Sequence, residues 1–381
     1  MPGFREMADS GRKERNMLEN LSDVRLTPVF ADAEMKCYEL TGGAYENQYY
    51  VISDPATSRL MNSPEVVGFE VYQSLLPSTS RMMRFLKEQG KITSANILSI
   101  LRGALNYPME ESCYREGIRV HDISFLSSER VFHHEELAGL EIKYSKLAMV
   151  PDSTLVIGDI IASGDTLKHC LSYVTDYYRK HHAKLRNILF FTIGAGRGIE
   201  LMEELTQEFR TFWPEFEGFI GVYYGGIFSM YDDRGLTGIQ VPMVDFYWKD
   251  GVIAPDYRKR TLEDVDALFE KCTIYDGGAR RYEILDHIHE VSEYWEQMRD
   301  RADLIDFDAF LHDKLGYPTP ISYEDWLVIN HYQNLDEDEM RDLYRTELNF
   351  LSYVEESGMN LRDLAEKRLS EFRTALRKYL L

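Results

Sequence analysis

The sequence is poor in cysteine and in basic residues, and it lacks any apolar run long enough to cross a bilayer. Its four cysteines, none of them in a CxxC pair, argue against a disulfide framework or a metal knuckle and favour a reducing cytoplasm. The 43 lysines and arginines face 64 acidic residues, which gives a net charge of −21. This balance does not suit broad binding to nucleic acids or to anionic membranes. The N-terminus has no apolar core of the kind found in signal peptides.

The chain does contain a series of short apolar segments that are typical of strands. A length of 381 residues is enough for about two domains. Helical stretches between the apolar segments indicate βαβ units. We therefore predict an α/β fold with a mostly parallel twisted sheet, helices on both faces, and ligands at the carboxyl ends of the strands. The expected strands lie at residues 96–101, 118–125, 140–147, 154–157, 187–193 and 219–224.

Composition shifts along the chain predict three consecutive regions. The first has no readable architecture, the second carries the expected strands, and the third is rich in Glu, Asp, Tyr and Leu at helical spacing. The regions are residues 1–60, residues 61–254 as the α/β domain, and residues 255–381 as a helical C-terminal extension.

Three local patterns give further expectations. Pro77 is expected to break the helical stretch 63–90 into two pieces. Residues 129–139 are polar and are expected to be irregular. The acidic run 336–342 is more typical of a solvated helix start than of a metal site. In the last third we expect long helices at residues 262–285, 288–311 and 323–381.

Residues 153–171 contain the most informative motif. A β-branched apolar run at 154–157 predicts a buried strand, and leucines at helical spacing follow from Leu167. The turn of small residues between them would aim backbone N–H groups and the positive end of the helix dipole at one point, where a phosphate fits. Asp159, at the mouth of the turn, can accept hydrogen bonds from sugar hydroxyls. The competing interpretation is an ordinary strand-to-helix turn without a ligand.

Four segments, in order, resemble the type I phosphoribosyltransferases, and most of all their uracil phosphoribosyltransferase branch. They are SILRGAL at 99–105, IRVHDI at 118–123, EIKYSKL at 141–147 and the loop at 158–166. The resemblance covers about residues 97–245, less than half of the chain. It implies transfer of the phosphoribosyl group of phosphoribosyl pyrophosphate (PRPP) to a nucleobase or related acceptor, with release of pyrophosphate and with Mg²⁺ on the pyrophosphate. Positioning and neutralisation of the leaving group would supply most of the rate.

The resemblance implies a role for each matching residue. Asp159 would hold the ribose hydroxyls and would meet the metal only through the substrate. Arg102 and Gly103 would meet the pyrophosphate, the first by charge and the second by close approach of its backbone. Lys146 would add positive charge near the phosphates, although a solvated strand lysine is the alternative. The 5′-phosphate would be cradled by Ala162, Ser163, Gly164, Asp165 and Thr166. The acceptor base would lie near Arg197, Tyr224 and Asp245, with a place in the core as the alternative for each aromatic ring.

The chain also departs from the family pattern. Gly158 stands where the family usually has an acid, and Asp159 stands where the uracil branch has proline. Asp165 places a negative charge in a phosphate loop. The insertion rich in His and Glu and the helical C-terminal third have no counterpart in the family pattern.

These departures keep two other functions open. The second hypothesis is a catalytically reduced protein that binds PRPP or a nucleotide and acts in regulation or partner binding. The third is an S-adenosylmethionine-dependent methyltransferase, because IGAGRG at 193–198 is similar to the glycine-rich loop of those enzymes, although a lone pattern of this kind is weak. The expected partners are small molecules, PRPP and a base-like acceptor, without membrane or broad nucleic-acid binding, and the sheet edge and long helices are compatible with a homodimer.

Overall fold

The computed structural model describes residues 23–101, 103–133, 136–230, 239, 246–270, 277–317 and 321–377. The chain forms two compact units that interleave along the sequence, whereas the sequence predicts three consecutive regions. Strand β3 (Gln48–Ser53), helix α3 (Phe69–Glu88) and strand β9 (Phe219–Met230) each run from one unit into the other. The first unit comprises Met1–Val24, Gly42–Tyr50 and Leu75–Tyr224, and the second comprises Arg25–Thr41, Val51–Ser74 and Gly225–Leu381.

The sheet of the first unit contains all six strands that the sequence predicts. Its strand order is β3-β9-β8-β7-β4-β5-β6. β4 is parallel to β5 and to β7, and β7 is parallel to β8, but β6 is antiparallel to β5. The sheet is therefore mixed rather than purely parallel. The elements that lie wholly in this unit are β4 (Ser94–Ile100), η1 (Ala104–Asn106), α4 (Met109–Arg115), β5 (Arg119–His133), β6 (Glu136–Lys146), β7 (Thr154–Gly158), α5 (Asp165–Lys180), β8 (Asn187–Ala195) and α6 (Arg197–Phe212).

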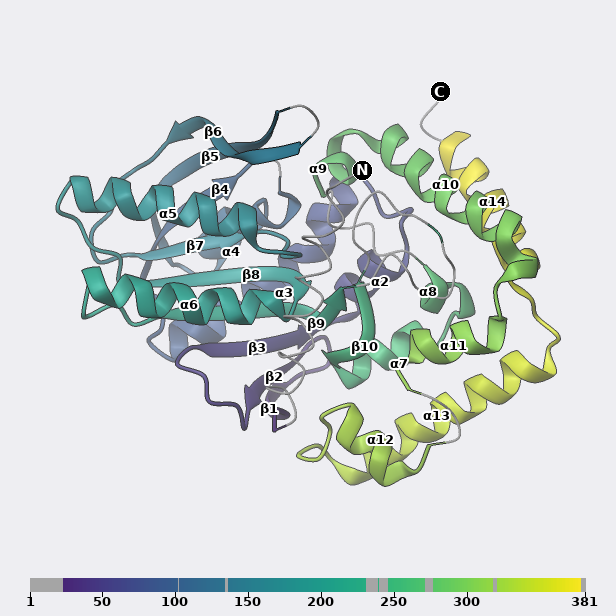
Figure 1. The fold of residues 1–381 in the computed structure, drawn as a ribbon. Coiled ribbons are helices and arrows are strands. Elements are labelled where there is room, and N and C mark those ends of the chain that lie inside the picture. Colours follow the sequence, from purple (N-terminus) through teal and green to yellow (C-terminus); the bar gives the residue numbers. More distant parts are fainter. Residues whose placement is uncertain are drawn as a thin grey trace. The chain divides into compact units, whose positions relative to one another are not determined.

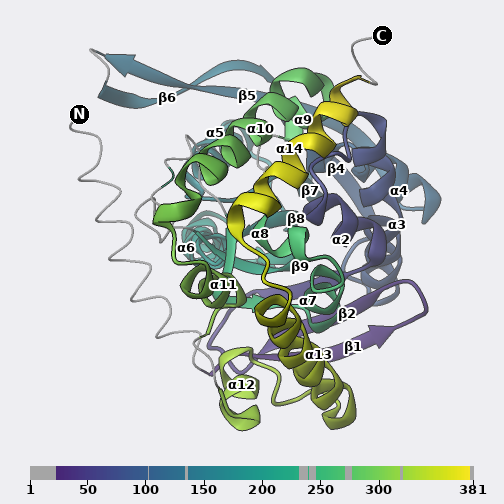
Figure 2. The same cartoon turned by 90° about the vertical axis from the view of Figure 1, so that its right-hand side faces the viewer.

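Helices cover both faces of this sheet. α5 and α6 lie on one face, and α4 with the C-terminal part of α3 lies on the other (Figures 1 and 2). Every residue of β7 and β8 is buried. Burial on both faces explains why these two strands are continuous apolar runs rather than alternating ones. The carboxyl ends of the parallel strands are thereby held in fixed positions for a site.

Two local predictions in this unit are wrong. Residues 129–133 and 136–139 are not irregular, because β5 continues through His133 and β6 begins at Glu136, and the two strands pair antiparallel up to these residues. The backbone ladder of this pair stabilises a segment whose side chains give little strand signal. Pro77 does not divide the helix, because α3 runs unbroken across it. The neighbouring Leu75 and Thr79 are buried, so packing on the core maintains the helix despite the missing N–H donor.

The second unit joins a few strands of the same ten-stranded sheet to a set of helices. β1 pairs with β2, and β10 pairs with the end of β9. None of the described helices combines the length and the apolar character needed to cross a bilayer. The strands of this unit are β1 (Arg25–Ala31), β2 (Lys36–Thr41) and β10 (Phe246–Ile253), and the helices are α2 (Pro55–Asn62), α7 (Pro255–Thr261), α8 (Val265–Phe269), α9 (Gly277–Tyr282), α10 (Ile284–Arg301), η3 (Ala302–Leu304), α11 (Phe307–Leu315), α12 (Tyr323–Ile329), α13 (Glu337–Glu356) and α14 (Leu361–Arg377).

The helices of the C-terminal third are shorter than the sequence predicts. The expected helix at 262–285 ends at Phe269, because Glu270 takes an extended conformation. The acidic run at 336–342 does begin a helix, as predicted. Asp336 caps α13 by accepting a hydrogen bond from the backbone N–H of Glu339, and acidic side chains fill the first turn, where they favour the helix dipole.

Candidate functional site

The turn between β7 and α5 forms the candidate site in the first unit. β7 ends at Gly158, and α5 begins at Asp165. The N-cap residue of α5 is Gly164, whose φ of +81° is a left-handed conformation that favours glycine. Glycine has no side chain with which to accept a hydrogen bond from the first helical turn. The N-terminus of α5 therefore presents its N–H groups without an acceptor from its own cap.

Asp159 lies at the mouth of this turn. Its backbone N–H donates to the carbonyl of Phe191 on β8, at 3.1 Å, and its carboxylate accepts a hydrogen bond of 2.9 Å from the N–H of Ile160. A Cβ atom on Gly103 would lie only 2.7 Å from Oδ1 of Asp159. The tip of β4 and the mouth of the turn are therefore in direct contact. Arg102 lies outside the described residues, but its neighbour Gly103 is against the carboxylate.

The Asp159 carboxyl titrates near neutral pH. Burial raises its pKa to about 7, and the hydrogen bond from the Ile160 N–H opposes that rise. Asp159 is only half-buried, so part of its side chain remains accessible to solvent. A carboxyl with such a pKa can be present as an acid or as a base in the pH range where proteins work.

The structure gives a packing reason for the glycine at position 158. A Cβ atom on Gly158 would overlap the carbonyl oxygen of Leu105 and lie 2.9 Å from the backbone nitrogen of Asn106. Both atoms belong to η1, the short helix that follows the tip of β4. No side chain fits at this position, so the mouth of the turn has one carboxylate instead of two.

The glycine-rich segment 193–198 packs against the same turn. Ile161 forms a parallel bridge with Gly194, and the N–H of Ala195 donates to the carbonyl of Ile161 at 2.9 Å. A Cβ atom on Gly194 would lie 2.9 Å from that carbonyl, and one on Gly198 would lie 2.8 Å from the hydroxyl of Tyr223. Close packing therefore accounts for these two glycines without a bound cofactor.

The five residues expected to cradle a phosphate span the end of the turn and the start of α5, which begins at Asp165. Ser163 and Asp165 are exposed, and Ala162, Gly164 and Thr166 are half-buried. The hydroxyl of Ser163 donates to the carboxylate of Asp165 at 2.8 Å. Lys146 lies at the end of β6, where its side chain is exposed.

The residues expected near the acceptor base make other contacts. The guanidinium of Arg197 binds Glu200 at 2.6 Å and Glu204 at 3.2 Å. Tyr224 is fully buried, and its hydroxyl lies 2.6 Å from that of Thr79, so its ring is part of the core. Asp245 lies outside the described residues. The acceptor site stays a prediction.

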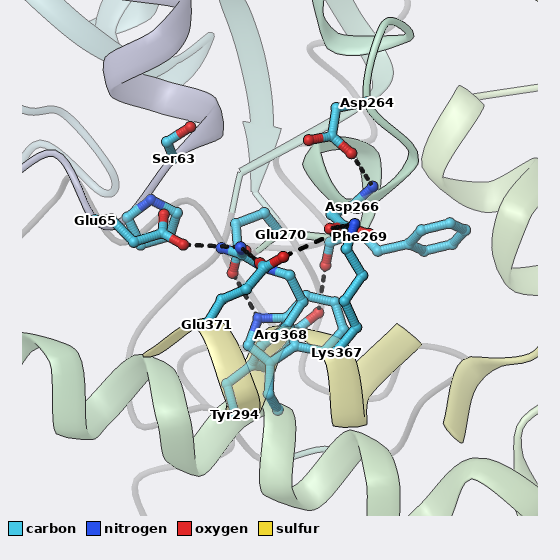
Figure 3. Close-up of polar contacts among 12 residues, drawn as sticks. Ser63, Glu65, Asp264, Asp266, Phe269, Glu270, Tyr294, Lys367, Arg368 and Glu371 are labelled. Carbon is cyan, nitrogen blue, oxygen red and sulfur yellow. Dashed lines mark hydrogen bonds and ion pairs between the residues drawn. The ribbon is translucent and has the colours of Figure 1, made fainter. Parts of the chain in front are cut away.

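The second unit contains a buried ionic cluster that the sequence does not reveal. Arg368 donates two hydrogen bonds to Glu270, at 2.9 and 2.7 Å, and binds Glu65 at 2.8 Å and Glu371, as Figure 3 shows. The indole of Trp295 also donates to Glu270, at 2.8 Å. Burial raises the pKa of Glu270 to about 7, although the charge of Arg368 opposes the rise. Because Glu65, Glu270 and Arg368 come from segments far apart in the chain, no local pattern could have shown that they pair.

Two clefts of about 560 and 530 Å³ lie in the second unit, and the Glu263–Asp266 region lines both. The larger cleft has an apolar floor formed by Leu262, Phe350 and Leu364. Arg368 lines the smaller cleft, but its guanidinium is already bound by carboxylates. Within the described residues, no three His, Cys, Asp or Glu side chains gather in a way that could hold a metal ion.

Comparison with known proteins gives only partial similarities. No family model and no curated protein matches the chain. Part of it is similar to the solved structure of a hypoxanthine phosphoribosyltransferase from Staphylococcus aureus, with 16% identity, 34% of this chain and 67% of that chain covered, and a TM-score of 0.26. A hypoxanthine-guanine phosphoribosyltransferase from L. donovani has 14% identity, with 35% of this chain and 77% of that chain covered and a TM-score of 0.28. A hypoxanthine-guanine phosphoribosyltransferase from Bacillus anthracis has 18% identity, with 34% of this chain and 72% of that chain covered and a TM-score of 0.24. None of these three belongs to the uracil branch, and their similarity is too low to assign this chain to a family.

Proposed function

We propose that the first unit binds PRPP and transfers its phosphoribosyl group to a nucleobase or a related acceptor, with release of pyrophosphate. The observation that carries this proposal is the contact between Asp159 and Gly103 beside the N-terminus of α5. It brings a carboxylate and a side-chain-free strand tip together at the mouth of the turn that leads to the N–H groups of α5. A sugar phosphate needs these three groups for its hydroxyls, its leaving pyrophosphate and its 5′-phosphate.

Each residue then has a defined task. The loop from Ala162 to Thr166 holds the 5′-phosphate through backbone N–H groups and hydroxyls. Asp159 accepts hydrogen bonds from the ribose hydroxyls, which requires its ionised form. Arg102 and Lys146 supply positive charge to the leaving pyrophosphate. The C1–O bond to pyrophosphate breaks as a nitrogen of the acceptor bonds to C1, and the acceptor loses a proton.

Mg²⁺ would be held mainly by oxygen atoms of the pyrophosphate. Asp159 would reach the ion only through the ribose. When bound, the ion would neutralise charge on the leaving group. The protein itself orients the ribose and holds the 5′-phosphate and the pyrophosphate at separate positions.

Binding and turnover are tested separately on the full chain. Melting temperature with and without PRPP and Mg²⁺ reports binding, and pyrophosphate release across a panel of bases reports transfer. We expect Arg102→Ala and Asp159→Asn to abolish release. Asp122→Asn is the matched control, because Asp122 accepts the same hydrogen bond from its following N–H but is exposed on β5. If both site variants remain fully active, the proposed site is wrong.

One observation favours a second function, in which PRPP or a nucleotide is bound without transfer. The backbone of η1 fills the position where a second acid would stand, so Asp159 has no neighbouring carboxylate at position 158. A protein of this kind would act as a sensor or as a partner-binding module. Stabilisation by PRPP together with no pyrophosphate release from any base would favour it over the transferase.

A further inference from the structure

The proposed phosphate loop has an unfavourable charge for a phosphate. Residues 159–166 include two carboxylates, Asp159 and Asp165, and no lysine or arginine. A phosphate monoester carries between one and two negative charges near neutral pH, because its second pKa is about 6. The side chains of the loop therefore repel the anion that its backbone is shaped to hold.

Asp165 is the carboxylate closest to the helix N-terminus. It is the first residue of α5, it is exposed, and it follows the left-handed Gly164 directly. Its Oδ2 accepts the hydroxyl hydrogen of Ser163 at 2.8 Å. A donor that the loop would offer to a phosphate is thus bound by an internal anion.

Two cations on the helices next to the loop do not cancel this charge, because they are bound by carboxylates. Lys168, on the first turns of α5, lies 3.3 Å from Glu204 on α6. Arg197, at the start of α6, binds Glu200 at 2.6 Å and also Glu204 at 3.2 Å. Burial would raise the pKa of Glu204, but its hydrogen bonds to Arg197 and Lys168 lower it, so this carboxylate is charged at neutral pH.

We infer that Asp165 is a specificity residue that sets the charge of the anion accepted by the loop, an inference that rests on the proposed function. Repulsion from Asp165 doubles when a monoanion becomes a dianion. The loop therefore prefers a singly charged ester, or a phosphate whose second charge is cancelled by a divalent cation, over a free phosphate dianion. The acid at position 165, which departs from the family pattern, then selects the charge state of the phosphate ester that binds.

The test compares two esters of the same shape and different charge. Ribose 5-phosphate and ribose 5-sulfate are titrated by calorimetry at pH 8 into the full chain and into Asp165→Asn. Asp176→Asn is the matched control. Asp176 is also exposed on α5, so this substitution removes the same charge but away from the loop. We expect Asp165→Asn to increase the affinity for ribose 5-phosphate by about three- to tenfold, and the affinity for ribose 5-sulfate by less. Asp176→Asn should leave both unchanged.

Magnesium provides an independent arm. Added Mg²⁺ should increase the affinity for ribose 5-phosphate more in the unmodified chain than in Asp165→Asn. The variant lacks the Asp165 charge that repels the phosphate, so neutralisation of the phosphate by Mg²⁺ gains less. An unchanged preference between the esters in Asp165→Asn overturns the inference while the proposed function stands. If neither ester binds either protein, and both melt cooperatively, the proposed function fails and this inference fails with it.

Discussion

Gly158 and Leu105 are in backbone contact, so that a β-carbon on Gly158 would overlap the carbonyl oxygen of Leu105. Gly158 ends the central strand β7, and Leu105 lies in η1 beyond the tip of the neighbouring β4. The contact fixes the distance between the two strand ends that form the candidate site. It also excludes the second carboxylate that the family pattern has at this position.

Gly158→Ala should therefore destabilise the protein. The new methyl group meets backbone rather than a flexible side chain, so η1 or β7 must move, at a cost of about 1–3 kcal/mol or more. Urea unfolding measures the loss. Gly90→Ala is the control, because a β-carbon on Gly90 would have no neighbouring atom within 4 Å and only the positive φ of this residue opposes the change. Equal stability of Gly158→Ala and the unmodified chain would show that the two strand tips are not packed together.

Asp159→Asn should stabilise the protein at high pH. The folded-state pKa of Asp159, about 7, is above the unfolded value of about 3.9. The folded state therefore binds the proton more tightly, and the contribution of this carboxyl to stability is full below about pH 4 and is lost as the pH rises through 7. Removal of the charge should raise the free energy of unfolding by roughly 1–3 kcal/mol at pH 8 and by much less at pH 4.

The control for this pH effect is again Asp122→Asn. Its carboxylate accepts a hydrogen bond of 2.7 Å from the N–H of Ile123, much as Asp159 does from Ile160, but it is exposed. Unfolding is followed at both pH values for the two variants. A gain for Asp159→Asn that is the same at pH 4 and pH 8 would contradict a buried, titrating carboxyl at the site.

Arg368→Met should destabilise the second unit in a pH-dependent way. The substitution leaves Glu270 buried without the guanidinium that binds it at 2.7 Å. Loss of one partner of a buried ion pair costs about 3–5 kcal/mol. The loss should be largest at pH 8, where Glu270 is ionised, and smaller at pH 5, where Glu270 takes up a proton because its pKa is about 7.

An exposed ion pair in the same unit provides the comparison. Arg362→Met removes a guanidinium that lies 2.6 Å from Asp303 on the surface. Surface pairs contribute about 1 kcal/mol or less, so this variant should unfold almost as the unmodified chain does. A loss for Arg368→Met as small as that for Arg362→Met would mean that the cluster in Figure 3 is hydrated and weakly coupled.

The sequence predicts the strands and the turn because their signals are local. Residues 154–157 and 187–193 are apolar runs typical of buried strands, and the small residues after position 158 mark the turn. The full length of the β5–β6 pair is not predictable in this way, because its far half is polar and only the pairing of one strand with the other stabilises it. Pro77 gives a wrong prediction for the same reason, since the packing of its neighbours decides the outcome.

The remaining features depend on contacts between distant parts of the chain. Glu270 and Arg368 are 98 positions apart. The helical spacing of Leu364 and Phe372 places Arg368 on the buried face of α14, but nothing local indicates its partner. Gly158 is visible in the sequence as a departure from a pattern, but the reason for it is a carbonyl in η1. A sequence can therefore indicate which residues surround a phosphate, while the number of carboxylates that fit beside it depends on tertiary packing.

Gly103→Ala should impair the site with little effect on the fold. Its β-carbon would lie 2.7 Å from Oδ1 of Asp159, which is the end of a side chain that can rotate away. The free energy of unfolding should fall by less than about 1 kcal/mol. The affinity for PRPP should fall by about tenfold to hundredfold, because the displaced carboxylate no longer meets the ribose hydroxyls.

The coupling of Gly103 to Asp159 can be measured with a double variant. Leu101→Ala, which alters the same strand tip without adding atoms beside Asp159, should leave the affinity for PRPP unchanged. In Gly103→Ala combined with Asp159→Asn, the loss should equal that of Asp159→Asn alone, because both substitutions remove the same interaction. Losses that multiply would mean that Gly103 contacts the ligand by itself, and the strand tip would then bind the pyrophosphate independently of the carboxylate.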